Sequence, residues 1–217
     1  MINWNEVDTV LLDMDGTLLD LNFDNHFWLV HVPSRYAEKN QINFEQACAL
    51  IHPHMREIRG TLNWYSIHYW SNHLDLDMLA LKSEVSHLVQ PRPGVFEMLG
   101  AIQHKQTVLA TNAHQDTLSV KFSKVPLAPY FDHVVTSHQL GAAKEHYEFW
   151  PALKTRVEFN PDRTLLVDDN KSVLEAAAEF GVKFLLTIDQ PDLQQPPQAA
   201  NGYPAISHFD QLTNKIS

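Results

Sequence analysis

Three predicted strands of this chain end in polar side chains that can carry out chemistry. The first is residues 7–12, VDTVLL, a short apolar run of the length expected for a buried strand. It stops at Asp13, and Asp15 follows directly after Met14. The other two end in the same way, residues 107–110 at Thr111 and Asn112 and residues 163–167 at Asp168 and Asp169. Because ligands of open α/β sheets bind outside the carboxyl ends of the strands, we expect these side chains to converge at one edge.

The order of the predicted elements favours an α/β fold. From residue 95 to residue 187, strand-like runs alternate with helical ones, a pattern typical of a parallel sheet covered by helices on both faces. Gly181 is well placed to end the helix that follows Asp169. The expected core is therefore a Rossmann-like parallel sheet.

A helical insertion interrupts this core after its first strand. From about residue 22 to residue 89, apolar residues such as Ile51 and Met55 recur at helical spacing. The segment 90–94, QPRPG, closes the insertion, because two prolines and a glycine do not continue a helix. We therefore predict two domains with hinges near residues 19–21 and 90–94: a catalytic core of residues 1–20 and 91–217, and an all-helical cap domain of residues 21–90.

Composition limits the classes of partner. The formal net charge is −10, from 16 Lys+Arg against 26 Asp+Glu, so binding to a nucleic acid polymer is not expected. The chain has neither an apolar run of membrane-spanning length nor a signal-peptide pattern, so no membrane association is expected. Cys48 is the single cysteine, which excludes an intrachain disulfide and agrees with a reducing compartment. These features favour a cytoplasmic protein.

Asp13 and Asp15 are close enough in the chain to flank one phosphoryl group, provided that the backbone bends just after the strand. Gly16 permits such a bend. Asp13 could attack phosphorus and form an aspartyl-phosphate, which divides a difficult hydrolysis into two easier steps. Asp15 could protonate the leaving oxygen and then deprotonate the attacking water, a role that needs a carboxyl pKa raised by acidic neighbours. The pair therefore predicts a nucleophile and a general acid–base.

The remaining polar residues predict a phosphate and metal site. Two carboxylates and a phosphate dianion repel one another unless a cation lies among them, and hard oxygen ligands favour Mg²⁺. Asp168 and Asp169 supply a second acidic pair for that cation. The Thr111 hydroxyl, Asn112 and the Lys144 ammonium are donors of the kind that bind phosphate oxygens.

Four motifs, taken in order, resemble those of haloacid-dehalogenase-superfamily phosphatases. They are residues 13–18 (DMDGTL), residues 109–112 (LATN), Lys144 and residues 167–170 (VDDN). Taken singly, each has a simpler explanation, such as a helix cap, a surface lysine or an acidic loop. Their joint occurrence in family order outweighs those explanations. The resemblance implies a phosphatase with a helical cap between the first and second motifs.

The same resemblance implies a magnesium site. In this family the metal is bound by the first acid of the first motif, here Asp13, and by the backbone carbonyl of the second, here Asp15. Where the fourth motif has two adjacent acids, the second usually contacts the metal directly, which assigns this contact to Asp169. Asp168 would then act through water.

Residues outside these motifs indicate a narrower group. Segments 9–21 (TVLLDMDGTLLDL), 23–28 (FDNHFW) and 61–65 (TLNWY) resemble the bacterial GMP/IMP nucleotidases. The resemblance implies that the partner is a small phosphorylated metabolite, a purine 5′-mononucleotide. The chain departs from the group at residues 141–144, GAAK, where a glycine, a larger residue and a proline commonly precede the lysine.

Candidate substrate contacts lie in the predicted cap. Asp24 and Asn25 follow the first hinge and could line a cleft between cap and core. Spacing alone favours burial for most aromatic residues of this segment. Trp64 lies off the helical face that contains Leu62 and Tyr65, so it is the candidate for stacking on a purine base.

Other functions are compatible with parts of this pattern. A sugar-phosphate phosphatase or a phosphomutase would place basic residues in the cap, where Arg35, Lys39, Arg56 and Arg59 occur. A dehalogenase does not need Asp15. A receiver-type signalling domain also combines acids, Thr and Lys around Mg²⁺, but its acidic pair comes before the phosphorylated Asp and it lacks a helical insertion. A protein that only binds is disfavoured because every catalytic position is filled.

Overall fold

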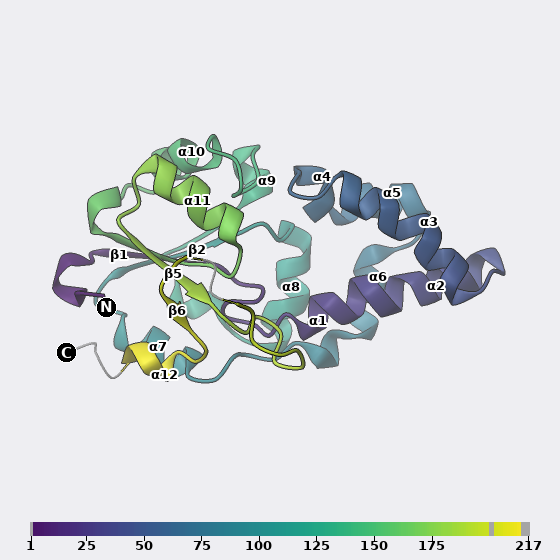
Figure 1. Cartoon of the computed structure of the whole chain (residues 1–217), viewed down its shortest axis with the longest axis horizontal. Helices are drawn as coiled ribbons and strands as arrows, with labels where there is room; N and C mark the ends of the chain where they lie inside the picture. Colours follow the sequence, from purple (N-terminus) through teal and green to yellow (C-terminus); the bar gives the residue numbers. More distant parts are fainter. Residues whose placement is uncertain (1, 200–201, 214–217) are drawn as a thin grey trace.

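The computed structural model describes residues 2–199 and 202–213, and in this part of the chain the strands form one parallel sheet in the order β3-β2-β1-β4-β5-β6 (Figure 1). The strands are β1 Thr9–Leu12, β2 Gln106–Thr111, β3 His133–Thr136, β4 Thr164–Val167, β5 Phe184–Ile188 and β6 Ala205–Ile206. Each neighbouring pair is parallel. The predicted α/β fold with a parallel sheet is confirmed.

Helices cover both faces of the sheet because successive residues of a buried strand point to opposite sides. In β1, Val10 and Leu12 belong to one apolar cluster and Leu11 belongs to the other. The first cluster packs against α7 Val95–Ala101, α8 Gln115–Lys124 and α12 Asp210–Thr213. The second packs against α10 Phe149–Arg156 and α11 Lys171–Phe180, with α9 Ser137–Leu140 beside them (Figure 1). The short 3₁₀ turns outside the insertion are η1 Trp4–Glu6, η4 Ala128–Tyr130 and η5 Pro161–Arg163.

Residues 22–88, called the helical insertion below, contain only helices and loops and extend from one end of the sheet (Figure 1). They comprise α1 Asn22–His26, the π-helical η2 Phe27–His31, α2 Val32–Asn40, α3 Phe44–Glu57, α4 Leu62–Tyr65, α5 Ile67–Leu74, α6 Met78–Glu84 and the 3₁₀ turn η3 Ser86–Leu88. Local capping explains several boundaries: Asn43 and Gln46 form a reciprocal capping box at the start of α3. None of the described helices is long and apolar enough to cross a membrane.

The two connections between the insertion and the sheet lie against each other. Leu19 and Pro91 form an antiparallel bridge. The amide of Asp20 donates to the carbonyl of Gln90 at 3.0 Å, and the amide of Arg92 donates to the carbonyl of Leu18 at 2.9 Å. The chain therefore leaves the core and returns to it at one place, next to the carboxyl end of β1. The core ranges predicted from the sequence also include residues 1, 200, 201 and 214–217, which lie outside the described residues.

Strand register determines where the polar residues meet. Leu12, the last residue of β1, is level with Leu109 of β2 and with Val167 of β4. The residues that follow these positions therefore emerge at the same edge of the sheet. The segment after β5 contains β6, which pairs with β5, and α12. A strand as short as β6 has no periodicity to detect.

Candidate active site

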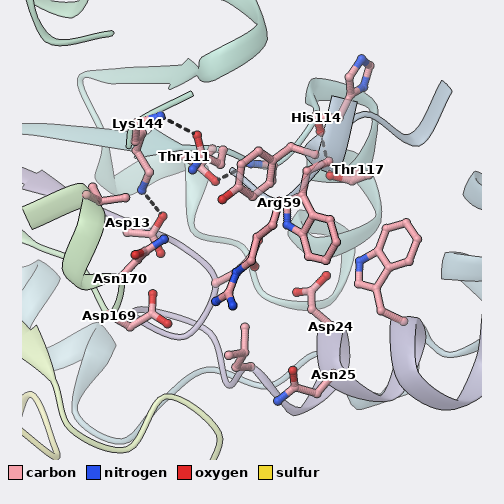
Figure 2. Close-up of a pocket in the computed structure, with 18 of the residues that line it drawn as sticks. Asp13, Asp24, Asn25, Arg59, Thr111, His114, Thr117, Lys144, Asp169 and Asn170 are labelled. Carbon is pink, nitrogen blue, oxygen red and sulfur yellow. Dashed lines mark hydrogen bonds and ion pairs between the residues drawn. The ribbon is translucent and has the colours of Figure 1, made fainter. Parts of the chain in front are cut away.

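Lys144 lies at the centre of the sheet edge. Its ammonium contacts the carboxylate of Asp13, lies 2.7 Å from Asp168 Oδ2, and donates to the carbonyl of Ala110 at 3.0 Å (Figure 2). The side chains of Lys144, Asp13 and Asp168 are all buried. These three acceptors use all three N–H donors of the ammonium group. They lie at the carboxyl ends of β1, β4 and β2, so three strands together fix the position of Lys144.

Burial dominates the titration of these groups. It raises the pKa of Asp13 to about 6, and the negative charge of Asp168 adds to the rise, while the Lys144 ammonium opposes it. Burial alone would lower the pKa of Lys144, but its contacts with Asp13 and Asp168 outweigh this and raise it. Lys144 therefore stays positively charged and favours the anionic form of Asp13.

Asp13, Asp168 and Asp169 form a cluster with a carboxylate oxygen of each within 4.8 Å of the others. Burial, and then the charges of Asp13 and Asp168, raise the pKa of Asp169 well above its ordinary value. Gly16 makes room for this cluster. Its φ is +85°, and a Cβ there would lie 2.6 Å from Asp169 Oδ2. The three carboxyl groups can carry more negative charge than the single neighbouring ammonium balances. Their oxygens are hard donors, so the cluster fits a cation of the Mg²⁺ type.

Asp15 faces a second buried lysine, Lys121 of α8. The Lys121 ammonium lies 2.5 Å from Asp15 Oδ1 and 2.7 Å from Asp24 Oδ2. Burial and the charges of Asp24 and Asp13 raise the pKa of Asp15 to about 6, although Lys121 opposes the rise. A carboxyl group with a pKa close to neutrality can both donate and accept a proton near neutral pH.

Asp24, a predicted substrate contact, has its carboxylate occupied by two lysines. Besides Lys121, it contacts Lys82 of α6, whose ammonium lies 2.8 Å from Asp24 Oδ1. Burial would raise the pKa of Asp24, but Lys121 and Lys82 outweigh it and hold the pKa below its ordinary range. This cluster joins α1 and α6, the first and last α-helices of the insertion, to α8 of the core.

Glu145, the residue after Lys144, connects three side chains around the site. It accepts hydrogen bonds from the side-chain amides of Asn112 and Asn170, at 2.9 and 3.1 Å, and from the hydroxyl of Tyr65 in the insertion. Asn112 Oδ1 in turn accepts from the Lys144 amide at 3.0 Å. The Asn112 side chain therefore fixes the loop that carries Lys144, and Glu145 connects that loop to α4.

All of the site residues predicted from the sequence line one pocket of about 380 Å³, a volume typical of small-molecule sites. The core provides Asp13, Asp15, Thr111, Asn112, Lys144, Asp168 and Asp169, and the insertion provides Asp24, Asn25 and Trp64. The structure thus brings the predicted residues together. Trp64 is half-buried beside Trp70, and the side-chain amide of Asn25 donates to Asp192 Oδ2 at 2.7 Å. Figure 2 shows Arg59 extending from the insertion into this pocket.

Sequence reasoning missed Lys121, Lys82, Glu145 and the contact made by Tyr65. A signal for Lys121 existed: with Thr117 and Leu118 it occupies the buried face of α8, a position where a lysine needs a partner. For Glu145, the one signal in the sequence was its position directly after Lys144. Tyr65 was expected to be buried in the helical face with Leu62, but its hydroxyl reaches Glu145 and its ring lines the pocket.

The model of the family described as haloacid dehalogenase-like hydrolase matches residues 10–187. The chain belongs to this family. It is 36% identical over 213 residues to the GMP/IMP nucleotidase YrfG of Escherichia coli (strain K12), which covers 97% of this chain and 96% of the relative. The chain is thus a hydrolase, and its resemblance to the nucleotidase group, expected from the motifs, is confirmed.

Solved structures agree with this fold. A phosphatase of the same superfamily from Thermococcus onnurineus superposes with a TM-score of 0.80 at 20% identity, covering 96% of this chain and 97% of the other. The putative hydrolase YfnB of Bacillus subtilis, in a magnesium-bound form that reveals interdomain movement, gives a TM-score of 0.66 at 17% identity, covering 97% and 99%. At these identities the likeness concerns the fold.

Proposed function

We propose that this protein is a Mg²⁺-dependent phosphomonoesterase of the cytoplasm that hydrolyses purine 5′-mononucleotides, with GMP and IMP as substrates. The observation that carries the proposal is that Asp13 contacts Lys144 and clusters with the two acidic residues of the fourth motif, in a pocket that Asp15 also lines. The choice of substrate rests on the 36% identity to a GMP/IMP nucleotidase along nearly the whole chain.

Asp13 is the proposed nucleophile. Its carboxylate attacks phosphorus, the bond to the leaving oxygen breaks, and an aspartyl-phosphate forms. Lys144, which contacts Asp13, keeps the attacking group anionic and is also a proposed phosphate-binding residue, exchanging one of its present acceptors for a phosphate oxygen. Thr111 and Asn112 end β2 at the same edge and are the proposed further phosphate-binding residues.

Asp15 is the proposed general acid–base. With a pKa of about 6 it can give a proton to the leaving oxygen in the first step. In the second step it removes a proton from the water that attacks the aspartyl-phosphate, so the protein returns to its starting state. Lys121 fixes the side chain of Asp15 beside the pocket.

Mg²⁺ fits the carboxylate cluster, and Asp13, Asp169 and the backbone carbonyl of Asp15 would hold it, with Asp168 acting through water. When bound, the cation would neutralise charge on the phosphoryl group and on the surrounding carboxylates. The related Bacillus subtilis protein has been seen with magnesium, which supports the assignment.

Residues 21–90 are the proposed cap domain, which closes over the core and excludes bulk water. The paired connections at Leu18–Asp20 and Gln90–Arg92 are the proposed hinge. Trp64 and Trp28 line the insertion side of the pocket and are the proposed contacts to a purine ring. Both tryptophans belong to the insertion, whereas the carboxylates at the sheet edge belong to the core.

A substrate with a second anionic group is the alternative that a specific observation favours. Arg56 and Arg59 line the same pocket, and neither has an ion-pair partner among the described residues. Two free guanidinium groups could bind a distal phosphate, as in a sugar phosphate or a phosphomutase intermediate. Substrate comparison distinguishes the two proposals.

The test measures phosphate release from a panel of mononucleotides, sugar phosphates and bisphosphates, with magnesium or EDTA. We expect magnesium-dependent release from GMP and IMP, and a loss of about a thousandfold or more in Asp13→Asn, because the nucleophile is gone. The matched control is Asp162→Asn, at an exposed aspartate of η5, which precedes β4, whereas Asp168 and Asp169 of the site follow that strand. Preference for sugar phosphates would overturn the substrate, and full activity of Asp13→Asn would overturn the mechanism.

A further inference from the structure

A second group of possible metal ligands lies at the contact between the helical insertion and the core. It consists of His68 on α5, His114 at the N-cap of α8, and Asp116 in the first turn of α8. A ligand atom of each lies within 4.8 Å of the others. The His114 ring is turned away from Asp13 and Asp169 in Figure 2, so this group is separate from the carboxylate cluster at the sheet edge.

The distances are close to those of a tetrahedral metal site. His68 Nε2 lies 2.8 Å from Asp116 Oδ2, and His114 Nδ1 lies 3.6 Å from the same oxygen. Bonds of about 2.0–2.1 Å to a tetrahedral Zn²⁺ place neighbouring ligand atoms about 3.3–3.4 Å apart, so small side-chain shifts are sufficient. A metal at His114 Nδ1 would replace the 3.3 Å hydrogen bond that this atom accepts from the Asp116 amide.

The buried ring of His114 has a further histidine as its neighbour. His138 lies beside it, with the two ring centroids 4.7 Å apart. The Nε2 atom of His138 faces the carbonyl of Leu62 at 3.1 Å, which requires a proton on Nε2 in the neutral ring.

His138 therefore carries a bare lone pair on Nδ1. This atom is buried and has no hydrogen-bond partner among the described residues. A buried unpaired nitrogen is costly unless it acquires a ligand or a water, so it marks the region around His114 as incomplete. Imidazole-rich sites with one carboxylate prefer Zn²⁺, Ni²⁺ or Co²⁺ to Mg²⁺.

We propose that His68, His114 and Asp116 form a second metal site, specific for divalent transition ions such as Zn²⁺, that holds the insertion against the core. His68 belongs to the insertion, whereas His114 and Asp116 belong to the core. An ion bound by all three is a removable crosslink between them. Mg²⁺, which prefers oxygen ligands, would not occupy it.

The first test uses Co²⁺ in the presence of excess Mg²⁺, followed by competition with Zn²⁺. An all-oxygen octahedral site absorbs visible light weakly, while a tetrahedral site with nitrogen ligands absorbs strongly, so the spectrum separates the two sites. We expect one strongly absorbing Co²⁺ per chain, displaced by Zn²⁺. His68→Ala should weaken binding by more than about tenfold, since even loss of an outer partner of a metal ligand costs about 10–100-fold.

The control is His73→Ala, which removes an exposed histidine of the same helix that is not in the cluster. It should bind Co²⁺ like the wild type. Asp116→Asn provides a second variant at a partly exposed position, and it should weaken binding as His68→Ala does. Absence of the strong absorption, or equal binding by wild type and both ligand variants, would overturn the site.

The crosslink is tested separately by amide hydrogen exchange. Zn²⁺ should slow the exchange of the amides of Asp20 and Arg92, which join the two connections, in the wild type and in His73→Ala but not in His68→Ala. Zn²⁺ that binds without slowing this exchange would overturn the bridging role. Neither measurement depends on turnover, so the outcome is independent of the proposed substrate.

Discussion

The hydroxyl of Tyr65 donates a hydrogen bond to Glu145, so the helical insertion contacts the residue next to Lys144. Glu145 also accepts from Asn112, which follows β2, and from Asn170, the N-cap of α11 after β4. Burial, and then the neighbouring Glu145, raise the pKa of Tyr65, so the hydroxyl remains a donor. The position of the insertion is thereby linked to the geometry of the phosphate-binding loop.

Tyr65→Phe should therefore lower kcat/KM for the preferred mononucleotide by about 5–10-fold, the effect of losing about 1–1.4 kcal/mol from one hydrogen bond. Steady-state kinetics measure this. Tyr69→Phe is the matched control, because the Tyr69 hydroxyl contacts His54 within the insertion at 2.5 Å and reaches no core residue in the described chain. Equal losses in the two variants would contradict the link.

Lys121→Met should lower the free energy of unfolding by about 3 kcal/mol, because it leaves two buried carboxylates without their shared partner. Asp24 keeps Lys82, but Asp15 loses its only ammonium contact among the described residues. Urea unfolding measures the change. Lys124→Met, an exposed lysine on the same helix, should change stability little. A similar small change in both variants would show that the Lys121 contacts contribute no net stability.

Gly16→Ala should be more harmful than Gly141→Ala, although both glycines have positive φ, +85° and +75°. Both substitutions incur the backbone strain of about 1–2 kcal/mol. Only at Gly16 would the added Cβ also meet the Asp169 carboxylate, while nothing lies within 4 Å at Gly141. Thermal unfolding should show the larger loss for Gly16→Ala, and calorimetric titration should show weakened Mg²⁺ binding in that variant alone. Unchanged Mg²⁺ affinity would contradict a metal role for Asp169.

The metal-free protein should lose stability as pH rises from about 4 to about 7. Burial raises the pKa of Asp13 and Asp15 to about 6 and that of Asp169 well above its ordinary value. The folded state therefore binds protons more tightly than the unfolded chain. This contribution is complete below the unfolded pKa of about 4 and is lost as pH rises through the folded values.

Thermal unfolding in EDTA across this pH range measures the loss, and the same series with excess Mg²⁺ should be flatter. Asp169→Asn should raise the melting temperature of the metal-free protein at the upper end of the pH range, because it removes one repelling charge. It should also abolish the stabilisation by Mg²⁺. Asp162→Asn should follow the wild type. A melting temperature that does not depend on pH in EDTA would contradict the strong coupling of these carboxylates.

Sequence patterns identified the parallel sheet because its strands are short, apolar and buried on both faces, as β1 and β4 are. They also indicated the residues at the strand ends, since parallel register places Asp13, Thr111 and Asp168 at one edge. Contacts between segments that are distant in the sequence could not be predicted from these patterns. The pairing of Lys121 with Asp15 spans 106 positions, and that of Tyr65 with Glu145 spans 80, so neither leaves a local pattern.

Because the connections at Leu19 and Pro91 lie side by side, the insertion leaves the core and returns to it at the same place. Its two ends are already adjacent, so a helical segment of different length could replace residues 22–88 at little cost in loop-closure entropy. The carboxylates and Lys144 are held by the strands and their loops, and they would keep their framework through such an exchange. A replacement segment could thus present a new surface to the substrate, provided that it restores the contacts that Asp24 makes with Lys121 and Tyr65 makes with Glu145.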